Sequence, residues 1–407
     1  MKNTIISGVC CALAIAPMVA SAGGFSLRER SAHAQGASFA GSTAAAADVS
    51  YMLFNPAALS SVERMETASS FSLILPDIKA TAAINGETQK PGVVGVVPAL
   101  AFGVRLTEDI VAGFGAFSPF GLTTEYDEDF VGAPDGIRSE LIAIAAGPGV
   151  AVDVGGGLSL GGAVYAVYND PQLTSATGVD PTTGAIQETK LDAKEIEFMG
   201  SLGALWRASE NTQIGLAFHT GYDITTGGVL STFDATGAPI QFPGDASISL
   251  PLSVSAGIRH QVTEDLALMA EFEWANWSEF DEIAVDVPAL GAGRDIGETT
   301  DYKDSIFVAV GGEYAWSDAL TLRTGFAYDQ TPTQASSRSI RIPDADRIWA
   351  SAGFSYAFSD KMRVDLGYSA IFFMDSDVTL LNGPASGTTV DYGGVTHILS
   401  VGGVYRF

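Results

Sequence analysis

Apolar and polar residues alternate along most of this chain of 407 residues. Between residues 361 and 372, for example, apolar side chains such as Leu366 and Phe372 stand at every second position, and polar side chains such as Asp365 and Ser369 stand between them. A period of two places successive side chains on opposite faces of an extended strand, whereas a helix would repeat every 3.6 residues. The alternation recurs in one segment after another, so the sequence predicts an all-β protein.

There are about fourteen alternating segments. The connections between them alternate between short turns and long polar loops. Thr107-Glu108-Asp109 is a short turn, and residues 171–189 form a long loop. Aromatic residues near predicted strand ends fit the girdles of a membrane barrel; they include Trp274, Trp277, Trp316 and Trp349. These features favour an antiparallel transmembrane β-barrel of about fourteen strands over a soluble β-sandwich. The predicted strands start near residues 66, 93, 110, 138, 157, 192, 211, 246, 264, 301, 318, 346, 361 and 393.

The end of the chain carries a separate signal. It closes on Tyr405-Arg406-Phe407, a strand-like segment with an aromatic residue at the last position and another two positions earlier. This ending resembles the assembly signal of bacterial outer-membrane proteins, which implies that the outer-membrane assembly machinery binds Phe407. The predicted location is therefore the outer membrane of a Gram-negative bacterium.

The N-terminal part of the chain does not share the alternation. Residues 1–22 have the features of a secretory signal, namely the positive charge of Lys2, an apolar core and the small residues Ala20-Ser21-Ala22 at the cleavage site. Residues 23–64 are rich in Ala, Gly and Ser. Because about fourteen strands leave a wide bore, we expect this segment to lie as a hatch, or plug, inside the barrel formed by residues 65–407.

Composition and charge exclude two classes of protein. The formal net charge is -26 at pH 7, and without a basic patch the chain is not expected to bind nucleic acid. Mean hydropathy is +0.23, yet beyond the predicted signal no apolar run approaches the ~18 to 20 residues of a membrane-spanning helix. Acidic residues gather in loops such as Glu125–Asp129, where solvation is one interpretation and divalent-cation binding another.

The sequence lacks the residue patterns of an enzyme or a metalloprotein. It has no Gly-x-Ser-x-Gly motif for a nucleophilic serine, and its four histidines are scattered. We interpret His219, on the polar face of a predicted strand, as a structural residue. Cys10 and Cys11 both lie in the predicted signal, so the mature chain offers no thiol to a metal. We therefore predict no catalytic activity, no metal site and no cofactor.

Several motifs, in order along the chain, resemble one family. They are Gly24-Phe25 and Asn55-Pro56-Ala57 near the start, Pro119-Phe120-Gly121-Leu122, Trp277-Ser278 with Phe280, and the segment from Arg338 to Arg347 that runs on through Trp349 and Gly353. Together they resemble the FadL family of outer-membrane transporters for long-chain fatty acids and other hydrophobic compounds. The resemblance covers essentially the whole mature chain.

The resemblance implies a barrel of fourteen strands plugged by an N-terminal hatch. In the family, a hydrophobic ligand binds in a pocket against the hatch, which implies that Phe25 contacts the ligand here. Asn55, Pro56 and Ala57 then correspond to a turn that leads the hatch out to the barrel wall. An Asx-type turn with a rigid proline fits that position.

The resemblance also implies how the ligand leaves. In the family it passes sideways into the membrane through a gap in the third strand, and here that gap corresponds to Ser118, Pro119, Phe120 and Gly121. Proline has no N–H to donate and glycine weakens strand pairing, so this sequence is suited to an interrupted strand. The implied partners are hydrophobic small molecules and the lipid of the outer membrane.

One departure from the family concerns the ligand's carboxylate. Fatty-acid transporters of this family hold it with basic residues in the lumen, and the corresponding positions fall near Gln172 and Glu298, which are not basic. Lys194, Arg294 and Lys303 are candidates to replace them. The sequence therefore leaves long-chain fatty acids and uncharged aromatic or aliphatic hydrocarbons open as substrates, with a less selective porin as a further alternative.

Overall fold

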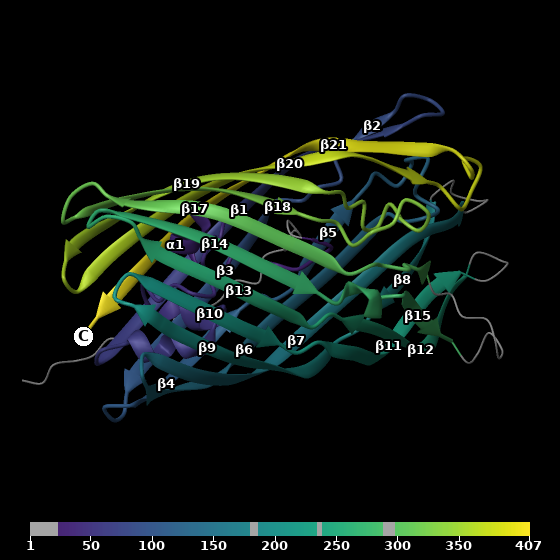
Figure 1. Ribbon diagram of the computed structural model, residues 1–407. Coiled ribbons are helices and arrows are strands. Elements are labelled where there is room, and N and C mark those ends of the chain that lie inside the picture. The colour runs from purple at the N-terminus through teal and green to yellow at the C-terminus, as the bar shows by residue number, and fades with distance from the viewer. Residues whose placement is uncertain (1–22, 180–185, 234–237, 288–297) are drawn as a thin grey trace, which may run out of the picture.

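An antiparallel sheet that closes on itself forms most of the computed structural model, which describes residues 23–407 apart from 180–185, 234–237 and 288–297 (Figure 1). The sheet is a barrel with fourteen strands in its wall. It closes because the first wall strand pairs with the last, with Glu66 opposite Arg406. The predicted fold class is confirmed.

Some wall strands are continuous and others are made of two pieces. The continuous ones are β1 (Met65–Ala82), β3 (Gly95–Arg105), β6 (Arg138–Gly155), β7 (Leu158–Val179), β17 (Ser305–Ala315), β18 (Leu320–Asp329), β19 (Arg347–Ser359), β20 (Met362–Thr379) and β21 (Thr389–Arg406). The two-piece ones are β4 (Ile110–Phe117) with β5 (Gly121–Glu125), β8 (Ile186–Asp192) with β9 (Glu195–Ser209), β10 (Thr212–His219) with β11 (Tyr222–Phe233), β12 (Pro239–Leu250) with β13 (Ser253–Gln261), and β14 (Leu266–Ala275) with β15 (Glu282–Asp286). Two short strands, β2 (Thr88–Gln89) and β16 (Glu298–Thr299), lie outside this wall pattern.

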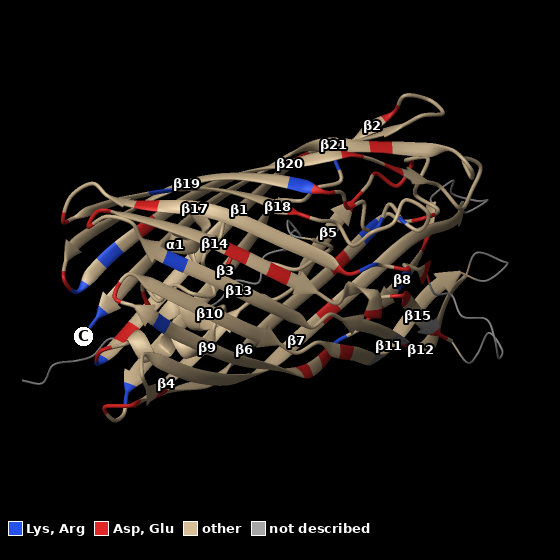
Figure 2. Cartoon of the chain, in the orientation of Figure 1, with Lys and Arg blue, Asp and Glu red and all other residues tan. Residues whose placement is uncertain are grey.

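The alternation predicted from the sequence sorts side chains between the two faces of the wall. On β20, Leu366 and Phe372 are 40% and 46% exposed on the outside, whereas Asp365 and Ser369 are 2% and 0% exposed on the inside. Figure 2 shows that charged residues gather mainly toward the two ends of the barrel. The outer surface between those ends is therefore the apolar band that contacts lipid.

The predicted aromatic girdle is wrong for two of its four tryptophans. Trp277 and Trp349 are 1% and 0% exposed and point inward, and the ring of Trp349 lies 6.0 Å from that of Phe39 in the N-terminal segment. Trp274 is partly exposed and Trp316 is 67% exposed. The wall needs large apolar side chains where it meets the N-terminal segment, and two tryptophans serve that contact instead of the membrane interface.

Residues 23–64, hereafter the hatch, lie inside the barrel (Figure 1, purple). They contain three short helices, α1 (Ala32–Gln35), η1 (Val49–Leu53) and η2 (Pro56–Ser61). No helix in the described part of the chain is long and apolar enough to cross a membrane. Wall glycines let the hatch backbone approach: a Cβ atom on Gly161 would lie 2.3 Å from the amide nitrogen of Ala57, and one on Gly325 would lie 2.1 Å from the carbonyl oxygen of Ala37.

Candidate functional site

The third wall strand is interrupted. Its first piece, β4, ends at Phe117, and its second piece, β5, begins at Gly121. The three residues between them belong to neither piece. The hatch backbone replaces the missing strand pairing, because the amide of Leu27 donates to the carbonyl of Pro119 and the amide of Gly121 donates to the carbonyl of Phe25, each at 2.9 Å. Backbone groups that would otherwise face lipid unpaired are thus satisfied from inside the barrel.

An aromatic cluster covers the inner side of this interruption. The ring of Phe25, which is 2% exposed, lies 4.7 Å from that of Trp277, 5.3 Å from that of Phe280 and 6.0 Å from that of Phe120. Tyr302 extends the cluster at 4.8 Å from Phe280. Edge-to-face pairs of this kind contribute about 0.5 to 1.5 kcal/mol each beyond their apolar burial. The predicted contact of Phe25 with a ligand stays a prediction, and the structure shows which rings a ligand would meet beside it.

Two aspartates hold the front end of the hatch. The backbone nitrogen of Gly23 donates to Asp329 and that of Gly24 donates to Asp344, each at 2.9 Å. Arg347 lies between these carboxylates, 3.7 Å from Asp329 and 3.1 Å from Asp344. Burial raises the pKa of Asp344, which lies in the connection between β18 and β19, and the positive charge of Arg347 opposes that rise. The start of the hatch is therefore tied to the wall by a buried ionic cluster.

The hatch turn makes a second attachment. The side-chain oxygen of Asn55, which is 0% exposed, accepts from the amide of Ala57 at 3.0 Å and caps η2 with Pro56 in its first turn. The side-chain nitrogen donates to the carbonyl of Thr43 at 2.8 Å and to that of Ala204 on β9 at 3.0 Å. One asparagine therefore joins two parts of the hatch to the wall.

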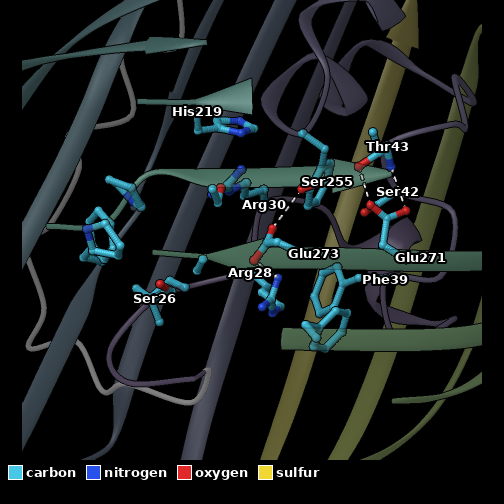
Figure 3. A pocket seen from close by; sticks show the side chains of 18 of the residues that line it. Ser26, Arg28, Arg30, Phe39, Ser42, Thr43, His219, Ser255, Glu271 and Glu273 are labelled. Atoms are coloured by element: carbon cyan, nitrogen blue, oxygen red, sulfur yellow. Dashed lines mark hydrogen bonds and ion pairs between the residues drawn. The ribbon is translucent and has the colours of Figure 1, made fainter. Parts of the chain in front are cut away.

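A small polar cavity of about 50 Å³ lies between the hatch and the wall, next to the strand interruption (Figure 3). Arg28 of the hatch pairs with Glu273 of β14 at 2.8 Å, and Ser255 donates to the same carboxylate at 3.1 Å. Glu271 accepts from the amide of Thr43 at 3.1 Å and also from its hydroxyl. Within the described ranges, no cluster of three or more His, Cys, Asp or Glu side chains could hold a metal ion.

The lysines suggested as carboxylate contacts lie elsewhere. The side chain of Lys194 is 65% exposed and its Nζ is 3.5 Å from Asp170. Lys303 borders a separate surface pocket of about 390 Å³. Neither residue lines the small cavity beside the interruption. Arg294 falls within 288–297, outside the described residues.

Sequence reasoning missed the basic residues that do line this cavity. They are Arg28 and Arg30 of the hatch. A signal for them was present, because these two arginines flank Glu29 in a segment otherwise built mainly of small uncharged residues. Partly buried charge of that kind needs partners, so it marks a place where the hatch meets polar groups of the wall.

The chain matches a known family and known sequences over nearly its entire length. A family described as outer membrane protein transport protein (OMPP1/FadL/TodX) matches residues 13–407. The chain is 28% identical to the 47 kDa outer membrane protein of Pasteurella multocida, over 88% of this chain and 89% of that protein. It is 28% identical to outer membrane protein P1 of Haemophilus influenzae, over 91% and 90% of the two chains. It is 25% identical to the long-chain fatty acid transport protein of Escherichia coli K12, over 93% and 94%.

Solved structures share the fold at lower sequence identity. A FadL homologue of Pseudomonas aeruginosa superposes with a TM-score of 0.85 at 20% identity, over 94% of this chain and all of that one. The toluene transporter TodX of Pseudomonas putida superposes with a TM-score of 0.72 at 20% identity, over 95% and 100% of the two chains. These likenesses support the barrel fold.

Proposed function

We propose that this chain, which belongs to the OMPP1/FadL/TodX family of outer membrane transport proteins, carries hydrophobic molecules, with long-chain fatty acids as the first candidate substrate. The resemblance noted in the sequence is confirmed, as are the outer-membrane location and the absence of an enzymatic role in the family. Related proteins named as long-chain fatty acid transport proteins support the choice of substrate.

The observation that carries the proposal is the interrupted third strand with the hatch bonded across it. Two hydrogen bonds join the hatch to the interruption, and the aromatic cluster lies on its inner side. A hydrophobic molecule gains about 0.8 kcal/mol for each CH2 that leaves water, so it gains from a route that opens into lipid and not into an aqueous channel. We therefore propose release into the membrane at Ser118 to Gly121.

The test is to close the interruption. Pro119→Val together with Gly121→Val restores an N–H and two β-forming side chains, and this should let β4 and β5 pair as one strand. We expect uptake of a radiolabelled fatty acid to stop, while the heat-modifiable gel shift of the folded barrel persists. Normal uptake by the double variant would show that the exit is not here.

Uncharged hydrocarbons are the second candidate substrate. Of the two positions where the family places basic residues, Glu298 is acidic and pairs with Arg341 at 3.2 Å, so it offers no positive charge to a carboxylate. Relatives in fold include a protein named as a toluene transporter. Competition between toluene and a fatty acid for the purified protein distinguishes the two substrates. Liposome swelling with sugars tests the porin alternative, since a plugged barrel should admit little sugar.

The same proposal assigns a role to each part of the chain. Residues 1–22 direct export, residues 23–64 act as a plug, and residues 65–407 form the membrane barrel. Phe407 is 46% exposed and its ring packs 4.8 Å from that of Tyr405 at the end of the last wall strand. Its exposed ring suits recognition by the outer-membrane assembly machinery.

A further inference from the structure

We propose that Arg30 of the hatch and His219 of the wall bind the carboxylate of an acyl substrate in the small cavity beside the strand interruption. This site rests on the proposed transport of hydrophobic molecules and defines the polar group that those molecules carry. It also differs from the basic residues weighed from the sequence, since it lies where the hatch meets the wall and not at Lys194 or Lys303.

Arg30 is a guanidinium without an anionic partner. One of its terminal nitrogens donates to the carbonyl of Leu53 at 2.7 Å, and its guanidinium carbon lies 4.6 Å from the ring centre of Phe117. Its Nε is buried and has no hydrogen-bond partner. Among the described residues, no carboxylate oxygen lies within 4.0 Å of its nitrogens, whereas the neighbouring Arg28 pairs with Glu273. A partly buried cation with a buried, unpaired N–H favours an anion as its partner.

His219 borders the same cavity from the wall. It is the last residue of β10 and its side chain is 7% exposed. Among the described residues, neither ring nitrogen makes a hydrogen bond of full geometry, and the ring has only a weak interaction with the backbone of Leu53. Figure 3 shows His219 and Arg30 as side chains of one pocket. A buried imidazole without a hydrogen bond of full geometry costs free energy, so the fold retains a polar group here that a ligand oxygen can satisfy.

The two acidic residues of the cavity are already occupied. Glu273 is bonded to Arg28 and to Ser255, and Glu271 accepts two hydrogen bonds from Thr43. The unpaired groups include two donors, the Nε of Arg30 and the Nε of Arg28, and the imidazole of His219, which in its neutral form offers one N–H donor and one acceptor nitrogen. A carboxylate supplies two acceptor oxygens and a negative charge, and its planar geometry matches a guanidinium.

The size and position of the cavity decide how such a ligand would lie. A volume of about 50 Å³ holds a group no larger than a few water molecules, so it has room for the carboxylate but not for the acyl chain. Pro119 and Phe120 of the interrupted strand line the same cavity. The acyl chain would then extend past these residues toward the interruption, and the carboxylate would be the last part of the ligand to leave the protein.

The test compares an acid with its neutral ester. Purified full-length protein in detergent is titrated with oleic acid and with methyl oleate, for the wild type, Arg30→Gln and His219→Phe. Loss of a charge-assisted hydrogen bond should weaken binding of oleic acid about tenfold or more in Arg30→Gln, with a smaller loss in His219→Phe. Binding of methyl oleate should stay within about twofold of the wild type in both variants. Lys303→Gln, which removes a positive charge outside the cavity, is the matched control and should bind both ligands normally.

The outcomes separate the site from the function. If Arg30→Gln binds oleic acid normally, or loses acid and ester equally, the carboxylate site is overturned while the transport function stands. Equal binding of acid and ester by the wild type would also overturn the site, since the cavity would then hold water only. If the wild type binds neither ligand, long-chain fatty acids fail as the proposed substrate and the site fails with them. The heat-modifiable gel shift checks that each variant is folded.

Discussion

Enlarging Gly161 should force the hatch away from the wall. A Cβ atom there would lie 2.3 Å from the amide nitrogen of Ala57 and 2.4 Å from the carbonyl carbon of Pro56, where ordinary contacts are 3.4 to 4 Å. Overpacking against backbone costs about 1 to 3 kcal/mol. Of the three hydrogen bonds of Asn55, one crosses from the hatch to the wall, to the carbonyl of Ala204, and it contributes about 1 kcal/mol. The strain in Gly161→Val therefore matches or exceeds this attachment, and a shift of ~3 kcal/mol changes the ratio of closed to displaced hatch about 100-fold.

Gly162 provides the matched control for this prediction. It is the next residue on the same strand, but its Cβ would point outward, with Leu202 as its nearest neighbour at 3.6 Å. We expect Gly161→Val to raise single-channel conductance in planar bilayers and Gly162→Val to leave it at the wild-type level, with both barrels folded by gel shift. Identical conductance for the two variants would refute the reasoning that the hatch blocks the lumen through its contact with this wall strand.

Two further predictions concern the hatch itself. Deleting residues 23–50 should leave a folded barrel, because the wall ladder closes without them, and should convert it into a leaky channel; unchanged conductance would contradict the plug assignment. Phe25→Ala should remove apolar contact worth ~1.5 to 3 kcal/mol and so weaken ligand binding several-fold or more while the barrel stays folded. Calorimetry checks the affinity, with Phe71→Ala on the lipid-facing surface as the control, and equal affinity for wild type and Phe25→Ala would argue against a ligand contact.

The wall was predictable from sequence because its pattern is local. A strand places alternate residues on opposite faces whatever its neighbours are, so the outward Leu366 and inward Ser369 follow from spacing alone. Ile371 is an apolar residue at one of the otherwise polar positions of this strand, and the structure supplies the reason. It points inward with 0% exposure and packs in the apolar cluster that contains Phe39 of the hatch and Trp349.

The contacts between hatch and wall were not predictable because they join residues far apart in the chain. Trp277 has the residue type and position expected of a membrane girdle, and only its contact with Phe25, more than 250 residues away, shows that it faces inward. No local sequence pattern indicates that Arg28 pairs with Glu273. None indicates that Arg30 lacks an ion-pair partner and leaves its Nε without a hydrogen bond. Motifs from the family indicated the region of the candidate site, and the geometry of this chain indicated the polar residues proposed for it.

The exit proposed at Ser118 to Gly121 requires few hydrogen bonds to break, so it does not require the barrel to unfold. The ladder between β1 and β21 pairs seventeen residues of each strand, from Glu66 to Ala82 and from Val390 to Arg406, so separating wall strands would break many hydrogen bonds at once. At the interruption, by contrast, the hatch contributes two backbone bonds and the ring of Phe25. Local openings with few bonds to break have low free energies compared with global unfolding. A movement limited to residues 25–27 would therefore uncover the interruption, while Asn55 and the ionic cluster at Asp344 keep the rest of the hatch in place.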